Sequence, residues 1–311
     1  MKPNALLASR AGLAGVALAL PALAIAMLPL TQAHAQTVEE LREMSIDDLA
    51  QVNVTSVSKT DQPLADAPAS IYVVTHDDIL RSGAATLPEM LRLAPNLQVY
   101  QTSPSNWVAT ARGQNGNLQA QNFSNKLLVL IDGRTVYTPL FSGVYWDMPD
   151  LLPDNVDRIE VISGPGAALW GSNAVNGVIN VVTRSSSETS GLYADVRAGP
   201  DRQVAGARIS GAAGEGLSYS LYGRLLHDEH FYTATGDSAE DGWNHYKGGF
   251  RLDWTPNDAD RLSLHGDIFD GREDLTGDRR VDISGRSATL LWAHDMASAG
   301  QLQVQAFYDR I

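Results

Sequence analysis

The 311-residue chain contains no cysteine, which excludes disulfide bonds, thiolate zinc sites and cysteine nucleophiles. Basic residues are scarce: 23 lysines and arginines stand against 36 aspartates and glutamates, and the formal net charge is −13. A nucleic-acid-binding protein is expected to present a basic face, so this balance argues against nucleic acid as a partner. After the N-terminus no apolar run is long enough for a transmembrane helix, so membrane entry would require a β-barrel.

Residues 1–35 have the composition of a secretory signal peptide. Two basic residues precede an apolar run over 11–30, and an A-x-A cleavage site ends at Ala35. A transmembrane anchor is the alternative, because the run is nearly long enough to span a bilayer. The small residues after the run favour cleavage. We therefore expect export and a mature chain that starts at Gln36.

Residues 36–68 form a polar lead that includes a short alternating segment. That segment consists of Val52, Asn53, Val54, Thr55, Ser56, Val57 and Ser58. An exposed extended segment can add as a strand to the sheet edge of a partner, where backbone hydrogen bonds supply the affinity. The same pattern also fits the first strand of the following domain, and the sequence leaves both interpretations open.

Residues 69–184 predict a mixed α/β globule, because its strands are continuous apolar runs rather than alternating ones. The segments 71–74 and 126–131 read as strands, and Thr75 and Thr86 are placed to cap two short helices.

Two turn regions contain residue types that also occur in catalytic or phosphate-binding loops. Asp132 and Gly133 follow a buried strand and predict a hairpin turn, which we favour over a nucleophilic aspartate. The segment 156–184 reads as strand, glycine-rich turn and strand. Its glycines permit positive φ and close backbone approach, and the Lys-Ser/Thr of a phosphate-binding loop is missing. We therefore expect a structural turn.

Residues 185–311 change to strict alternation of apolar and polar side chains, typical of transmembrane barrel strands of about ten residues. Tight turns at 212–216, 255–260 and 297–300 alternate with longer polar loops at 228–243 and 271–285. A soluble β-sandwich with one wet face is the alternative. Seven strands are predicted, at residues 192–198, 205–210, 217–225, 246–254, 261–268, 289–296 and 301–309.

Catalytic and metal sites have little support in the sequence. His227 and His230 flank two acidic residues, but they lie at a strand–loop junction where solvated charge is the default. No local Ser/His/Asp arrangement and no G-x-S-x-G occurs. We expect no catalytic residue, no bound metal and no cofactor.

Residues 41–184 resemble the plug domain of TonB-dependent outer-membrane receptors, and 141–146 is similar to the subgroup of siderophore and iron-complex receptors. Ser163 departs from the arginine usual at its position, and an insert that begins at 114–117 departs from the usual apical sequence. The segments that match the plug pattern are 66–75, 78–84, 88–95, 111–113, 125–138 and 156–184.

The resemblance implies an α+β plug domain followed by the N-terminal strands of an antiparallel transmembrane β-barrel. Receptors of this type have barrels of about 22 strands around a plug. Seven strands cannot close around so large a domain, and an open edge in lipid would leave backbone groups unpaired. We therefore expect a truncated receptor. Within the plug, the resemblance implies structural roles for Arg112, Gly113, Asp132, Gly133, Gly164, Pro165, Gly166, Trp170, Gly171, Asn176 and Gly177.

The resemblance also implies partners. The segment 52–58 falls where such receptors carry the TonB box, which pairs with a TonB-type inner-membrane energy-coupling protein. The other partners are outer-membrane lipid and a large ligand such as a ferric siderophore or cobalamin. A signalling receptor and a soluble periplasmic binding or scaffold protein are the alternatives. Contact with the ligand is predicted for Trp107, Asn115, Phe141, Tyr145 and Trp146, although the aromatic residues can equally pack against the barrel wall.

Overall fold

The computed structural model describes residues 53–54, 62–63, 70–111, 113, 126–138, 143–164, 170–275 and 279–311, all within one compact unit, Asp48–Ile311. No helix in the part of the chain so described is long and apolar enough to cross a membrane. Several predicted features lie outside the described residues: the signal peptide with Ala35 and Gln36, and Val52, Thr55, Ser56, Val57, Ser58, Arg112, Asn115, Phe141, Pro165 and Gly166.

A five-stranded mixed sheet forms the centre of the α/β globule, in the order β3-β8-β9-β6-β7. The glycine-rich segment is a hairpin, as predicted, because β8 and β9 pair antiparallel while β6 joins β9 in parallel. The strands are β3 (Ser70–Thr75), β6 (Leu127–Ile131), β7 (Arg134–Thr135), β8 (Val156–Ser163) and β9 (Gly177–Thr183).

Two short helices follow β3, and both begin at the predicted threonines. In α2 (His76–Ser82) the Thr75 hydroxyl accepts from the backbone N–H of Asp78, whose carboxylate accepts in return. In α3 (Leu87–Leu91) the Glu89 carboxylate accepts from the backbone N–H of Thr86. These caps satisfy backbone donors that have no partner inside the helix.

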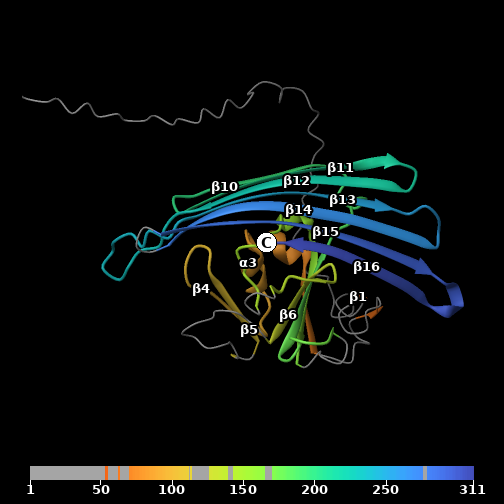
Figure 1. Ribbon diagram of the computed structural model, residues 1–311, viewed down its shortest axis with the longest axis horizontal. Coiled ribbons are helices and arrows are strands. Elements are labelled where there is room, and N and C mark those ends of the chain that lie inside the picture. Colours follow the sequence, from red (N-terminus) through yellow and green to blue (C-terminus); the bar gives the residue numbers. More distant parts are fainter. Residues whose placement is uncertain are drawn as a thin grey trace, which may run out of the picture. The chain divides into compact units, whose positions relative to one another are not determined.

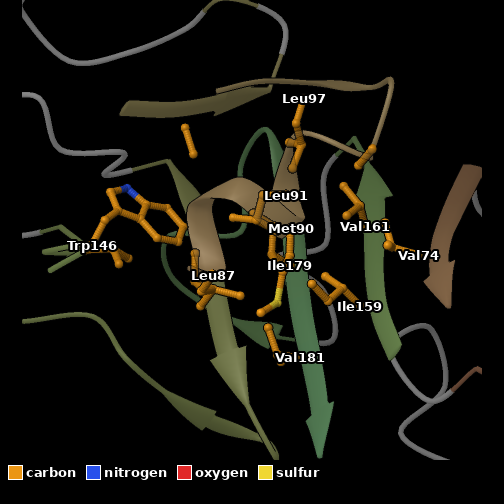
Figure 2. Packing of buried hydrophobic residues seen from close by; sticks show 14 of the residues in the cluster. Val74, Leu87, Met90, Leu91, Leu97, Trp146, Ile159, Val161, Ile179 and Val181 are labelled. Carbon is orange, nitrogen blue, oxygen red and sulfur yellow. The ribbon is translucent and has the colours of Figure 1, made fainter. Parts of the chain in front are cut away.

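The main hydrophobic core lies between these helices and one face of the mixed sheet. Figure 2 shows Leu87, Met90 and Leu91 of α3 packed toward residues of β8 and β9 such as Ile179. A hairpin of β4 (Leu97–Gln101) and β5 (Trp107–Ala111) adds to this core. Every residue of β5 and β6 is buried, which explains why these strands read as continuous apolar runs.

The remaining chain forms one seven-stranded antiparallel sheet in chain order from β10 to β16 (Figure 1). This confirms the seven predicted strands, and within the described residues β10 and β16 are its two edges. Its strands are β10 (Gly191–Ala198), β11 (Arg202–Gly214), β12 (Leu217–Asp228), β13 (Trp243–Trp254), β14 (Asp260–Leu275), β15 (Arg279–Asp295) and β16 (Gln301–Arg310).

The two faces of this sheet differ in chemistry. Its outer face carries exposed apolar side chains such as Leu192, Leu225 and Ile268, with exposures of 80, 51 and 65%. Its inner face carries buried polar side chains, among them Arg224 and His245. An apolar outward face over a polar interior is the arrangement of transmembrane β-barrel strands. This face contradicts the soluble alternatives, which need a wet outer surface.

The predicted long loop at 271–285 is wrong over most of its length. β14 continues to Leu275 and β15 begins at Arg279, so the two strands pair almost to the turn. Polar residues occupy both faces here, so the apolar alternation ends before the strands do. Exposed cross-strand ion pairs, Arg272–Asp282 and Arg280–Asp274, lie along the extension. The loop between β12 and β13 does span residues 229–242, close to the prediction.

Four short elements complete the described chain. β1 (Asn53–Val54) pairs antiparallel with β2 (Gln62–Pro63), and the side chain of Val54 is fully buried. The 3-10 turns η3 (Pro153–Asn155) and η4 (Ala297–Ala299) precede β8 and β16.

Candidate functional site: the interface between the globule and the sheet

A buried ion pair joins the two parts of the chain through β12. Arg224 donates through Nε to the Asp150 carboxylate and through Nη2 to the backbone oxygen of Ala85. Both charged side chains have almost no exposure. Buried charges are costly to desolvate unless they are paired, so each of these groups needs the other to stay in place.

A second interface arginine, Arg208 of β11, contacts the turn that precedes β8. Arg208 lies 2.6 Å from the Asp154 carboxylate and donates to the side-chain oxygen of Asn155 at 2.8 Å. Arg184 and His76 approach the same carboxylate at 3.7 and 3.6 Å. The Asp154 carboxylate is therefore surrounded by basic groups from both the globule and the sheet.

A third contact connects the sheet to the start of α3. Arg202 of β11 pairs with Glu89, the capping residue of α3, and with Asp228 of β12. Beside it lies the small apolar part of the interface, in which Ala85 packs on Val204, Leu226 and Trp243.

The Asp132–Gly133 turn makes the fourth contact between the globule and the sheet, with residues of β13, β14 and β16. The Asp132 carboxylate accepts from the backbone N–H and the hydroxyl of Thr183, at 2.8 and 2.6 Å. Arg251 of β13 and His265 of β14 lie 3.7 and 3.8 Å from it. Gln305 of β16 donates to the Asp132 backbone oxygen at 2.8 Å. The sequence predicted only the turn, and the structure adds its role as a junction.

A cavity opens between the globule and strands β12–β16. Tyr145 and Met148 line it from the globule, and Tyr222, Lys247 and Phe269 line it from the sheet. Burial, and then the neighbouring Asp147, raise the pKa of the Tyr145 phenol, so this group stays neutral and can donate a hydrogen bond.

Of the three predicted ligand-contact residues that the structure describes, Trp107, Tyr145 and Trp146, only Tyr145 lines the cavity. Trp107 and Trp146 are buried in the hydrophobic core, with exposures of 3 and 4%. At these exposures neither tryptophan ring is accessible to a ligand in this structure, which does not support ligand contact by Trp107 and Trp146. Their ring area is used for packing between the β4–β5 hairpin, α3 and the mixed sheet.

The described structural residues predicted for the plug lie at turns, except Gly177, which begins β9. Positive φ angles occur at Gly113, Gly133, Gly164 and Gly171. Gly177 lies so close to β8 that an added Cβ would be 2.5 Å from the Ile162 oxygen. The remaining two residues, Trp170 and Asn176, lie in the connection between β8 and β9, where Gly164 donates to the Asn176 backbone oxygen at 3.1 Å.

Sequence reasoning missed the arginines of the inner face as functional residues. The alternation of these strands puts Arg208, Arg224 and Arg251 on the polar face, but a polar face that meets water has the same sequence pattern as one that meets a protein domain. The sequence did contain one indication of this role: several arginines occur on the polar face of strands whose opposite face is apolar. The histidines at 227 and 230 contact Glu229, and the described residues contain no cluster of three or more ligands suited to a metal ion.

Comparison with known proteins matches residues 63–178 to the TonB-dependent Receptor Plug Domain. The vitamin B12 transporter BtuB of Vibrio vulnificus is 32% identical over 183 residues, which cover 58% of this chain and 27% of the relative. The ferric enterobactin receptor of Pseudomonas aeruginosa is 27% identical over 187 residues, covering 55% and 24%. The chain thus spans about a quarter of the length of these curated relatives.

Solved structures show the same fold. The ferripyoverdine receptor of the outer membrane of Pseudomonas aeruginosa superposes with a TM-score of 0.65 at 14% identity, over 83% of this chain and 36% of the receptor. The copper transporter OprC gives a TM-score of 0.61 at 20% identity, over 77% and 37%. The plug match, the curated relatives and this fold agree. Residues 63–178 thus match the plug domain of TonB-dependent receptors, to which the α/β globule corresponds, and the chain is similar to such receptors of the Gram-negative outer membrane.

Proposed function

We propose that the protein takes up a large, scarce ligand across the outer membrane, with the plug as the gate. The observation that carries this proposal is the chemistry of the plug–sheet interface. Its described contacts are mainly ion pairs and hydrogen bonds, and its buried apolar cluster has only four residues. Polar contacts can be exchanged for water at a small net cost, whereas a large apolar interface cannot. Such an interface suits a plug that must move.

We propose that energy enters through the segment 52–58. A TonB-type inner-membrane protein would pair with it as an added strand and pull on the plug. In the structure Val54 is buried and β1 is already paired with β2. The segment must leave this pairing before a partner strand can take its place.

A ferric siderophore or cobalamin is the ligand class we propose. Relatives in both groups carry those names, a vitamin B12 transporter and a ferric enterobactin receptor. Tyr145 and the cavity beside it offer a neutral phenol and apolar surface to an amphipathic chelate. Asn115 and Phe141 remain proposed contacts.

Uptake in cells that lack their own receptors for these ligands tests the proposal. Cells expressing the protein are supplied with radiolabelled cobalamin or with a labelled ferric siderophore, and both surface binding and internal label are measured. We expect accumulation of one ligand class, abolished when the proton gradient is collapsed. Binding without energy-dependent accumulation of either class would contradict the transport proposal.

Val54→Pro tests more specifically whether the segment 52–58 couples the protein to its energy source. Proline removes a backbone donor and disfavours a paired strand, so coupling is lost while ligand binding stays. Val54→Ile, which keeps the donor and the β-branched side chain, is the matched control and should transport normally. Equal uptake by both variants would show that this segment is not the coupling strand.

A further inference from the structure

Two acidic side chains meet across the interface between the plug and the sheet. Asp147 belongs to the plug segment that follows Trp146, and Glu273 points inward from β14. Their exposures are 7 and 8%, and their carboxyl groups lie within hydrogen-bonding reach of each other. One carboxyl oxygen of Glu273, Oε1, is buried with no protein partner assigned to it.

The surroundings of this pair supply no counter-charge. Glu273 stands in register between Trp243 of β13 and Val281 of β15. In the described chain no lysine, arginine or histidine forms an ion pair with either carboxyl group. Charged groups on the neighbouring strands have other partners. Asp228 of β12 lies in the same register row and pairs with Arg202, and Arg224 of β12 and His245 of β13 both face Asp150. Tyr145 is the remaining titratable neighbour on the plug.

Two carboxylates this close repel each other when both are ionised, which favours retention of a proton by one of them. If one carboxyl group keeps its proton, the same contact becomes a short, charge-assisted hydrogen bond. Burial raises the pKa of Asp147 well above its ordinary value, and the charge of Glu273 raises it further.

We propose that Asp147 and Glu273 share one proton and act as a carboxyl latch, which holds the plug on β14 while protonated and releases it on deprotonation. The latch would make the attachment of the plug sensitive to the local proton concentration. It concerns how the plug is held and does not depend on which ligand is taken up.

The direction in which pH changes the attachment of the plug follows from the raised pKa of Asp147. A carboxyl group whose pKa is raised in the folded state contributes most below its unfolded value, near 3.8. That contribution falls as the pH rises from there through the raised folded value. The attachment should therefore weaken with rising pH across this range, opposite to an ordinary paired carboxylate.

Infrared spectroscopy of the protein purified from outer membranes detects the shared proton directly. A protonated carboxyl group has a carbonyl stretch that disappears on ionisation. We expect this band in the wild type at pH values where ordinary aspartates are ionised, and its loss in Asp147→Asn and in Glu273→Gln. Glu89→Gln is the matched control, because Glu89 is a plug acid already paired with Arg202, and it should leave the band unchanged.

Thermal unfolding of the plug measured against pH gives the second readout. Relative to Glu273→Gln, whose amide donates without a titrating proton, the wild type should lose stability as the pH rises. A wild-type spectrum without the band overturns the proposal even if every variant fails to fold. An unchanged pH slope in a folded Glu273→Gln protein overturns it as well.

A bridging cation is the competing explanation for two close carboxyl groups. Stability is therefore measured at fixed pH with a chelator and then with added calcium or magnesium. The carboxyl latch predicts no response in the wild type. A stabilisation by cation that Glu273→Gln abolishes would replace the shared proton with a metal bridge and overturn the proposal.

Discussion

Single arginines on the inner face of the sheet hold the plug through buried acids. Arg224 is the most enclosed of them, since its guanidinium contacts Asp150 and the Ala85 backbone and has no exposed surface. Removing one partner of a buried pair leaves the other charge uncompensated, which costs more than the pair contributes when intact.

Arg224→Ala should therefore destabilise the attachment of the plug by about 3–5 kcal/mol. Urea unfolding of the plug in the purified protein measures this change. Arg272→Ala is the matched control, because Arg272 pairs with Asp282 at the exposed end of β14 and such pairs contribute at most about 1 kcal/mol. Equal losses in the two variants would contradict the role given to Arg224.

The Asp132 side chain has a distinct, testable role within the plug. Asp132→Ala leaves the Thr183 N–H and hydroxyl without an acceptor, so we expect a loss of about 1–3 kcal/mol. Asp132→Asn keeps an acceptor and tolerates the φ of 49° at this position, so it should lose less. The same urea titration compares the two. A smaller effect for alanine than for asparagine would argue against the hydrogen bonds.

At the scale of elements, large side chains of the sheet lie over glycines of the next strand. The ring of Tyr222 on β12 covers Gly249 on β13, where an added Cβ would lie 2.5 Å from the ring. Gly271 is covered in the same way by Ile283 of β15. These contacts help to fix the register of neighbouring strands.

Gly249→Ala should destabilise the sheet by about 1–3 kcal/mol through overpacking against Tyr222. The adjacent Gly248→Ala is the matched control, because its nearest neighbour, the Tyr222 backbone oxygen, would be 3.7 Å from the new Cβ. Thermal unfolding of both variants decides the matter. A larger loss in Gly248→Ala would show that the ring contact does not set the packing.

Sequence patterns predict a strand or helix well where its side chains meet one kind of surroundings, such as the buried core, or where a capping residue marks its start. The buried strands of the plug read as apolar runs, and both helix starts follow from Thr75 and Thr86. Sequence patterns fail for the β14–β15 extension, where polar residues lie on both faces and exposed ion pairs accompany the backbone pairing of the strands. They fail for Trp107 and Trp146 too, because aromatic residues in a polar segment do not reveal that the segment folds back over the core.

At the scale of the whole molecule, pairings between distant residues determine the site. Arg224 and Asp150 are 74 positions apart, and Arg134 and Asp309 are 175 apart. Alternation predicts which face of a strand is polar, but not which plug residue a given arginine meets. The interface therefore had to be read from the structure, although the plug and the strands were predicted.

The central claim is that one face of the sheet meets lipid while the other holds the plug. Because the chain has no cysteine, one introduced cysteine can be labelled alone with a fluorophore. The adjacent residues Leu221, exposed, and Ser220, buried, are the matched pair, and quenching by a nitroxide on lipid acyl chains is measured in bilayers. The structure predicts strong quenching at Leu221→Cys and little at Ser220→Cys. Equal quenching at the two positions, or quenching of Leu221→Cys by a water-soluble agent alone, would contradict the account.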